Sequence, residues 1–286
     1  MDQAKLIDEF LASGCVAIRG AFSRESAREF SKAAWTRLGY DPDDRATWAE
    51  SRIHLPTLAS VSVPELVPRV WDAMKVLCGG EERIAGTPRW GDGFIVNLGA
   101  DDHADTWEPP TASAPGWHKD GDFFRHFLDS PEQGLLVIAL WSDVVPTGGA
   151  TFLAHDSVKP VAEFLAARPE GVAPDGFPFG ELIGRCSRFS EATGEAGDVF
   201  LMHPYLLHAS SRNALRLPRL ITNPPLHLAA PMNFDRPDGS YSPIERAVLN
   251  ALGVEQLDFQ PTAPRERIVP ERVRRQQEAE RNLIAG

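Results

Sequence analysis

From residue 94 onward the apolar residues of this chain come in short runs separated by glycine, proline and aspartate. Runs of this length between turn-forming residues are typical of β-strands, and several in one chain indicate a sandwich or barrel. We therefore expect a mainly β fold with flanking helices, built on a double-stranded β-helix (jelly roll). The expected strands are Phe94 to Leu98, Leu135 to Trp141, Thr151 to Leu153, Val199 to Met202 and Leu220 to Thr222.

Helix-capping and helix-ending residues mark four other segments. Serine before an amphipathic segment and glycine after it are the usual helix boundaries, and serine with glutamate three residues later forms a capping box. The expected helices are Ser23 to Leu38, Pro64 to Leu77, Lys159 to Arg168, and one that Ser242 caps and Gly253 closes.

The length of 286 residues and the hydrophobic content of 43% are enough for one full core. We expect a single domain over residues 1–286. Within it, residues 1–92 form a mainly helical N-terminal layer, residues 93–225 the jelly-roll core, and residues 226–286 a C-terminal helical extension.

The charge and cysteine content limit partners and compartment. A net charge of −11 argues against a nucleic-acid partner, because phosphate binding relies on clustered lysine and arginine. The arginine-rich segment 265–281 is interleaved with glutamates, so we expect a solvated helix there. Three separated cysteines without a Cys-x-x-Cys pattern indicate a reducing compartment, and no signal-peptide pattern is found, so we expect a cytoplasmic protein. The longest fully apolar run, Leu135 to Trp141, is too short to span a membrane, and the oligomeric state stays open.

The residues that suggest chemistry are His118, Asp120 and His208. Two imidazoles and one carboxylate form the facial triad of non-heme iron oxygenases, which leaves coordination positions open. On a strand, residues i and i+2 point to the same face, so His118 and Asp120 can reach one ion. His208 follows His118 by 90 residues (208 − 118). We expect one strand from Asp198, broken once by Pro204, to deliver His208 to the pocket.

Other histidines have plainer interpretations. A His-x-Asp pair recurs by chance, and most histidines in globular proteins are surface or hydrogen-bonded core residues. His203 is the rival third ligand, but we expect it to be a buried, hydrogen-bonded residue. His126 is expected to form a surface pair with Asp122 or to contact a lid.

Arg219 lies in a short apolar segment 11 residues after His208 (219 − 208). A buried guanidinium needs an anionic partner, and a dicarboxylic acid offers a carboxylate to its planar fork. Ser210, two residues after His208, is expected to face the same site.

These segments resemble the phytanoyl-CoA dioxygenase family of Fe(II)/2-oxoglutarate-dependent oxygenases over roughly Phe94 to Pro225. The segments that carry the resemblance are Trp117-His118-Lys119-Asp120-Gly121, Pro146-Thr147-Gly148-Gly149-Ala150-Thr151, Gly197-Asp198-Val199-Phe200-Leu201-Met202-His203, His208-Ala209-Ser210 and Arg219. The chain departs from the family pattern at Ala154-His155-Asp156-Ser157, where a Pro-Gly-Ser-His turn is frequent, and this leaves the role of His155 open.

By this resemblance, His118, Asp120 and His208 hold Fe(II), and Arg219 pairs with the distal carboxylate of the cosubstrate 2-oxoglutarate. Ser210 donates its hydroxyl to that carboxylate, and Thr151 lies nearby on the facing sheet. The implied reaction consumes O₂, releases succinate and CO₂, and hydroxylates a moderately apolar small molecule. Desaturation or cyclisation by the same cofactors remains an alternative, as do a metal-dependent hydrolase and a non-catalytic jelly-roll binding protein.

The long polar loop Gly99 to Pro115 leads directly into the His118 segment. Loops of this length are usually lids or solvated connections. It contains acids, no lysine or arginine, and a central Trp107. If the loop is a lid, its charge repels a coenzyme A thioester, and we expect free acids or neutral molecules as substrates.

Overall fold

The computed structural model describes residues 2–270 and 274. The strands are β1 Cys15–Ile18, β2 Arg52–His54, β3 Ser60–Ser62, β4 Arg89–Gly91, β5 Ile95–Asn97, β6 Leu135–Leu140, β7 Thr151–Ala154, β8 Phe189–Ala192, β9 Val199–Met202, β10 His208–Ser210, β11 Arg219–Thr222 and β12 Pro225–Leu226. The α-helices are α1 Gln3–Ser13, α2 Arg24–Leu38, α3 Val63–Leu66, α4 Pro68–Cys78, α5 His103–Thr106, α6 Val158–Ala166, α7 Phe179–Ile183 and α8 Pro243–Leu252.

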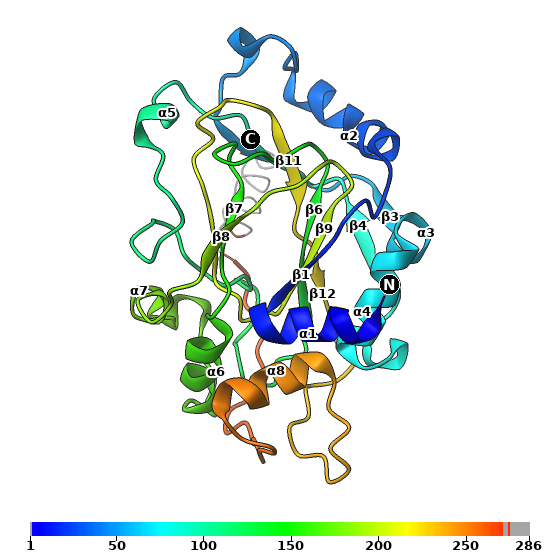
Figure 1. The fold of residues 1–286 in the computed structure, drawn as a ribbon, viewed down its shortest axis with the longest axis vertical. Coiled ribbons are helices and arrows are strands. Elements are labelled where there is room, and N and C mark those ends of the chain that lie inside the picture. Colours follow the sequence, from blue (N-terminus) through cyan, green and yellow to red (C-terminus); the bar gives the residue numbers. More distant parts are fainter. Residues whose placement is uncertain (1, 271–273, 275–286) are drawn as a thin grey trace, which may run out of the picture.

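Two antiparallel sheets form the centre of the molecule (Figure 1). The larger has the order β1-β9-β6-β11-β5-β2, with β12 also paired to β6, and the smaller has the order β10-β7-β8. Buried side chains from both sheets belong to one hydrophobic core. The predicted mainly antiparallel jelly-roll core with flanking helices is therefore confirmed.

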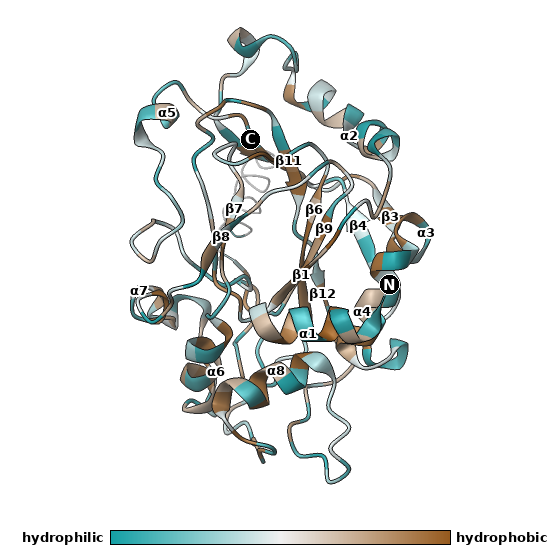
Figure 2. Ribbon diagram, in the orientation of Figure 1, coloured by the Kyte–Doolittle hydropathy of each residue, from teal (hydrophilic) through white to brown (hydrophobic). Residues whose placement is uncertain are grey.

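The central strands of the larger sheet are apolar along their whole length. Every residue of β6 and of β9 is buried, and Val137 pairs with Leu201 in the register between them. A strand covered on both faces reads as a continuous apolar run, which explains why the sequence identified both. Figure 2 shows these strands as hydrophobic and much of the outer helix surface as hydrophilic.

The first 92 residues contribute strands as well as helices. β1 pairs with β9 at one edge of the larger sheet, and β2 pairs with β5 at the other. The segment expected to be mainly helical thus also contains four strands: β1 and β2, of four and three residues, complete the core sheet, and β3 and β4 form a separate two-stranded sheet. Such short segments carry too little periodicity to be recognised in a sequence.

The helix predictions are confirmed in outline and wrong in one detail. Ser23 caps α2, which ends at Gly39, and Ser242 and Glu245 form the predicted capping box of α8. The expected helix from Pro64 to Leu77 is instead divided into α3 and α4 at Pro68. Proline lacks an N–H donor and disfavours helical geometry in the preceding residue, so the first helix ends there.

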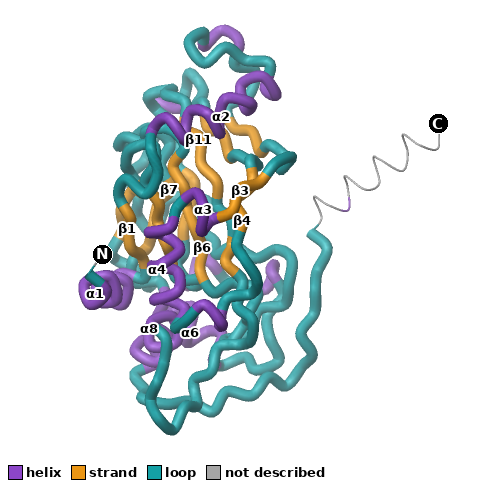
Figure 3. The backbone as a smooth tube through the Cα atoms, turned by 90° about the vertical axis from the view of Figure 1, so that its right-hand side faces the viewer, coloured by secondary structure: helices purple, strands orange, loops and turns teal. Residues whose placement is uncertain are grey.

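The helices lie at the ends and sides of the sheets. Figure 1 shows α1, α4, α6 and α8 grouped at one end, and Figure 3 shows α3 and α4 beside the strands. At the other end α2 is held by aromatic packing, because Phe30 stacks on Trp141 with 4.5 Å between ring centroids.

The expected solvated helix over residues 265–281 is wrong for residues 265–270, which are extended. Arg267 bridges to Phe124, and the ion pair of Arg265 with Asp129 (2.6 Å) fixes the segment beside the chain that follows Asp120. Residues 271–273 and 275–281 of that prediction lie outside the described residues. No helix within the described chain is long and apolar enough to cross a membrane.

Candidate metal and cosubstrate site

His118, Asp120 and His208 come together between the two sheets. One ligand atom from each lies within 4.8 Å of the others, as a metal-binding group requires. Nε2 of His118 is 3.5 Å and Nε2 of His208 is 3.4 Å from Oδ1 of Asp120. The backbones of the two histidines pair with each other, because each accepts the other's N–H, at 3.0 and 2.9 Å.

Both imidazole rings are held in the orientation that a metal ligand needs. Nδ1 of His118 lies 2.7 Å from the carbonyl of Gly116, and Nδ1 of His208 lies 3.1 Å from that of Leu206. A carbonyl can only accept, so each Nδ1 carries the proton and each Nε2 lone pair faces the centre of the triad.

The carboxylate of Asp120 is ionised and fixed. Burial alone would raise the pKa of Asp120, but the imidazoles of His208 and His118 lower this pKa well below its ordinary value. Its Oδ2 accepts a hydrogen bond of 3.1 Å from Nδ2 of Asn223, just beyond β11. Oδ1 therefore stays directed at the two histidines. Sequence reasoning did not identify Asn223, since only the fold brings it to Asp120.

The expected continuous strand from Asp198 to His208 is wrong. β9 ends at Met202 in the larger sheet, and β10 begins at His208 in the smaller one. Between them the chain turns at Pro204, and the N–H of Leu206 bonds the carbonyl of His203 at 2.9 Å. A proline cannot donate in a sheet, so the chain leaves the first sheet and crosses to the second.

His203 is a core residue, as the sequence analysis expected. It is fully buried, its Nε2 donates to the carbonyl of Ile244 at 3.1 Å, and its Nδ1 accepts from the N–H of Tyr205 at 3.1 Å. Burial lowers the pKa of His203 to about 3. With both nitrogens occupied and no place in the metal-binding group, His203 does not compete with His208.

Arg219 is buried with both terminal nitrogens of its guanidinium unpaired. Its side chain is almost completely inaccessible, and its Nε donates to the carbonyl of Gly149 at 2.7 Å. Neither Nη1 nor Nη2 has a hydrogen-bond partner among the described residues. Burial lowers the pKa of Arg219 to about 9, and the charge of Arg52 adds to this effect. Two unpartnered donors on a buried guanidinium fit a carboxylate that is not part of the chain.

The geometry places Ser210 and Thr151 on the side of the triad. In β10 and β7, His208 faces Leu153 and Ser210 faces Thr151 across the pair. Residues two apart on a strand, and residues directly opposite in a pair, point to the same face. Ser210 and Thr151 therefore share the face of His208. Thr151 also lies two residues after Gly149, whose carbonyl accepts a hydrogen bond from Arg219.

A cavity of about 820 Å³ opens beside the triad. Its lining combines His118, Asp120 and Asn223 with apolar side chains such as Phe123 and Phe177. The cavity could hold a small molecule with an apolar body next to the candidate metal ligands.

The interpretation of His126 as a surface residue is wrong. His126 is buried, and its Nε2 donates to the carbonyl of Gly121 at 2.7 Å. Its Nδ1 accepts from the ammonium of the buried Lys119 at 2.8 Å, and Gln133 lies 3.4 Å from the same ammonium. This arrangement fixes the segment that carries Asp120. The sequence shows only that His126 follows Asp122 by four residues, and this spacing does not indicate the buried contacts with Lys119 and Gly121.

The loop Gly99 to Pro115 is tied to the body of the protein. Arg216 forms an ion pair with Asp101, and Arg212 donates to the carbonyl of Thr106 at 2.7 Å. Trp107 packs partly buried against the core, and its buried indole N–H has no partner among the described residues. The charge of Asp101 is thus compensated by an arginine from outside the loop. The role of the loop as a lid stays a prediction.

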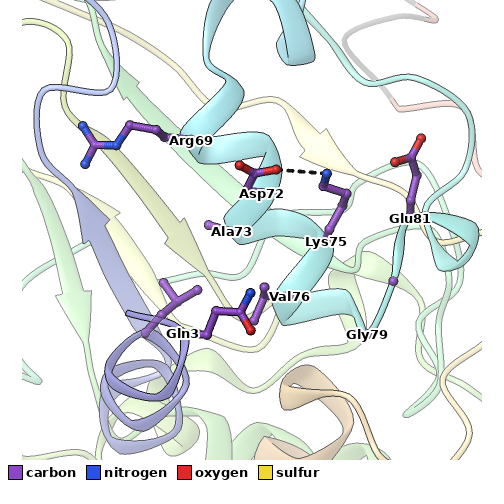
Figure 4. A pocket seen from close by; sticks show the side chains of 10 residues that line it. Gln3, Arg69, Asp72, Ala73, Lys75, Val76, Gly79 and Glu81 are labelled. Carbon is purple, nitrogen blue, oxygen red and sulfur yellow. Dashed lines mark ion pairs between the residues drawn. The ribbon is translucent and has the colours of Figure 1, made fainter. Parts of the chain in front are cut away.

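Two further features lie apart from the triad. His155 accepts from the hydroxyl of Ser190 at 2.7 Å and has its other ring nitrogen 3.2 Å from the carbonyl of Ser13, so its contacts are structural. A second cavity, of about 620 Å³, lies beside α1 and α4 (Figure 4). In this cavity Lys75 and Asp72 form an ion pair with each other at 3.0 Å, so neither charge needs a ligand to balance it.

Comparison with known sequences gives one significant match and no matching protein-family profile. The match is L-proline trans-4-hydroxylase of Streptomyces griseoviridis, 25% identical over 186 residues. It covers 55% of this chain and 65% of the relative's length, so the chain spans just under two thirds of that enzyme. The comparison agrees with the resemblance.

Several solved structures match this chain at low sequence identity. The non-heme alpha ketoglutarate dependent epimerase SnoN has a TM-score of 0.46 and 17% identity, with 77% of this chain and 80% of that chain covered. HygX of Streptomyces hygroscopicus, solved with nickel and 2-oxoglutarate, has a TM-score of 0.43, 17% identity and coverage of 77% and 84%. EctD of S. alaskensis, solved with 2-oxoglutarate and 5-hydroxyectoine, has a TM-score of 0.43, 18% identity and coverage of 79% and 76%.

Proposed function

We propose that this chain is an Fe(II)/2-oxoglutarate-dependent dioxygenase that hydroxylates a small molecule and releases succinate and CO₂. The observation that carries the proposal is the buried Arg219, whose Nη1 and Nη2 have no partner in the part of the chain that the structure describes. A metal-binding triad alone would also suit a hydrolase. A hydrolase leaves those two buried donors unexplained, whereas a dicarboxylate cosubstrate supplies their acceptor.

The donor set fits Fe(II). Two neutral imidazoles and one ionised carboxylate form the facial arrangement typical of iron oxygenases, and His118, Asp120 and His208 would hold the ion. When bound, Fe(II) and 2-oxoglutarate would activate O₂ for oxidation of the substrate. Asn223 fixes Asp120, and the carbonyls of Gly116 and Leu206 fix the rings, so the chain pre-orients every ligand.

The remaining roles belong to binding and positioning. Arg219, with the hydroxyl groups of Ser210 and Thr151 on the face of His208, would anchor the distal carboxylate of 2-oxoglutarate. The cavity with Phe123 and Phe177 would hold the substrate beside the metal and keep water from the reacting C–H bond. The hydroxylase relative acts on L-proline, which makes L-proline a first compound to test.

The test is an anaerobic titration of the purified protein with Fe(II) and 2-oxoglutarate, followed by succinate measurement on admission of air. We expect a weak visible charge-transfer band in the wild type and its loss in His118→Ala and His208→Ala. His203→Ala is the matched control, because it removes a buried histidine outside the triad. Circular dichroism confirms folding of each variant. If His208→Ala keeps the band while folded His203→Ala loses it, the ligand assignment is wrong.

Product analysis distinguishes the alternatives. Hydroxylation adds one oxygen atom to the substrate, whereas desaturation removes two hydrogens and cyclisation closes a ring. A protein that binds 2-oxoglutarate without any succinate release in air, across substrate panels, would be a binding protein. Hydrolysis without a requirement for 2-oxoglutarate would support the hydrolase alternative.

A further inference from the structure

A second arginine lies in the same row of the larger sheet as Arg219. Asn97 of β5 pairs with Arg219 of β11 on one side and with Arg52 of β2 on the other. Directly opposite residues of antiparallel strands have their side chains on the same face. Arg52 and Arg219 therefore share one face, with Cα atoms two strand spacings apart, or about 10 Å.

This face is the one that borders the triad cavity. His54 and Ile95, which pair with each other two residues along from Arg52 and Asn97, both line the cavity. Side chains two residues apart on a strand point the same way. Arg52, on the edge strand β2, thus points to the same side of the sheet as His54, which lines the cavity, while Arg219 of the same row is buried.

The charge of Arg52 acts on Arg219. Burial first, and then the charge of Arg52, lower the pKa of Arg219. Such an effect needs proximity, which agrees with the places of the two arginines in one row of the sheet, two strands apart.

Arg52 is exposed to solvent, and its side chain forms no hydrogen bond or ion pair within residues 2–270 and 274. Its pKa is lowered by burial, and no nearby acid counteracts this effect. Two other arginines, by contrast, have partners within the protein: Arg216 pairs with Asp101, and Arg212 donates to the carbonyl of Thr106. A cation beside a cavity, without a partner from the described chain, is suited to pairing with an anionic ligand.

We propose that Arg52 binds a carboxylate of the substrate, and that the substrate is a small organic acid in its free form with an apolar body. This inference rests on the proposed function, in which Arg219 and the metal ligands account for the cosubstrate. One guanidinium fork matches one carboxylate, whereas a phosphate with nearly two charges usually takes several cations. Phe123 and Phe177 offer the cavity's apolar surface.

The proposal is tested by ligand-induced shifts in melting temperature, measured anaerobically with Fe(II), with and without saturating 2-oxoglutarate. The probes are matched pairs: L-proline with L-prolinamide, cyclohexanecarboxylate with cyclohexanecarboxamide, and inorganic phosphate alone. The variants are Arg52→Gln and Arg52→Glu, with Arg28→Gln on the exposed side of α2 as the control. Half-saturating concentrations of 2-oxoglutarate are determined for each protein.

We expect the wild type to bind at least one acid roughly tenfold more tightly than its amide, as one charge-assisted hydrogen bond contributes. Arg52→Gln should abolish this preference, Arg52→Glu should reverse it, and Arg28→Gln should retain it. The half-saturating concentration of 2-oxoglutarate should change little in Arg52→Gln, because Arg219 remains.

Several results overturn the proposal. These are a wild type that prefers neither acid to its amide, an acid preference that survives in Arg52→Gln, or tighter binding of phosphate than of both acids. Loss of 2-oxoglutarate binding in Arg52→Gln would assign Arg52 to the cosubstrate instead. Failure of the proposed function looks different: no protein, including the wild type, would respond to 2-oxoglutarate, while the acid preference is still measured without it.

Discussion

Arg219 presents the strongest single test of the site. Its guanidinium is buried, and two of its nitrogen atoms have no partner within residues 2–270 and 274. Removing one partner of a buried charge-assisted pair costs about 2 to 5 kcal/mol. Arg219→Ala should therefore raise the concentration of 2-oxoglutarate needed for half-maximal binding by orders of magnitude. Iron affinity should be nearly unchanged.

Arg219→Lys separates charge from geometry. Lysine keeps the charge but not the planar fork, so it should restore only part of the 2-oxoglutarate affinity. Isothermal titration with Fe(II) present and O₂ absent measures both variants. Equal 2-oxoglutarate affinity in folded Arg219→Ala and wild type would remove the main support for this cosubstrate.

Asn223 is expected to act through Asp120. It donates to Oδ2 of Asp120 at 3.1 Å and thereby holds Oδ1 toward the two histidines. Loss of such a supporting hydrogen bond typically lowers metal affinity by roughly 10- to 100-fold. Chelator competition should show this loss in Asn223→Ala, while Asn250→Ala, at an exposed position of α8, should bind iron as the wild type does. Equal affinities in all three proteins would contradict the role of Asn223.

The residues that the sequence identified and those that it missed differ in kind. His118, Asp120 and His208 were found because metal ligands need particular side chains, and Arg219 because a charge stood among apolar residues. Asn223 reaches Asp120, and Arg52 comes into one row with Arg219, only when strands far apart in sequence pair. No local pattern distinguishes either of them from an ordinary polar residue.

At the level of elements, long apolar runs and helix caps were predictable. β6 and β9 are buried on both faces, and α8 begins at a capping box, so each carries a strong local signal. β2 and β10 have three residues each, and their place depends on pairing partners rather than on composition. The crossing from β9 to β10, which turns at Pro204, was not predicted for the same reason: the pairing partners of β10 cannot be read from its composition.

The capping box of α8 extends into a buried ionic network. Glu245 is fully buried, and it accepts from Arg83 at 3.0 Å and from the N–H groups of Asn233 and Ser242 at 2.7 and 2.9 Å. Glu245→Gln leaves Arg83 without its ionic partner. We expect it to lower the free energy of unfolding by about 3 kcal/mol at pH 7, measured by urea denaturation. Glu255→Gln, an exposed change in the same region, should leave it unaltered.

The same network has a pH dependence with a defined sign. Burial would raise the pKa of Glu245, but hydrogen bonds from Arg83 outweigh it and lower the pKa from the ordinary 4.5 to about 2. A group with a lowered folded-state pKa stabilises the fold above its unfolded pKa, and this contribution disappears as the pH falls through the folded one. The difference between wild type and Glu245→Gln should thus shrink below pH 4.5. A difference that stays constant down to pH 3 would show that ionisation of Glu245 is not its source.

At the scale of the whole molecule, the sheets and helices share one core. β1 and β2 from the first 92 residues form the edges of the larger sheet, and α8 from beyond residue 225 packs against α1, α4 and α6. The site takes its parts from segments about 100 residues apart, between His118 and Asn223 (223 − 118 = 105). Its geometry therefore depends on packing between distant segments, and the single domain expected from the sequence stays a prediction.

The three cysteines can test whether the protein unfolds as one unit. Cys15 lies in β1, Cys78 ends α4, and Cys186 follows α7, so they sample three separate regions. Burial is the main cause that raises the pKa of each thiol to about 12, so at pH 8 almost none is the reactive thiolate. We expect no reaction with a thiol reagent in the native state and labelling of all three in urea.

If the chain is one cooperative domain, the three labelling transitions should coincide with the loss of circular dichroism. Cysteine-to-alanine variants that keep one thiol at a time resolve the individual transitions. Early labelling of Cys186 alone would instead mean that the α6–α7 side opens independently of the core. In that case the half of the cavity that contains Phe177 could open while the metal ligands on the paired strands stay in place, and the single-domain prediction would fail.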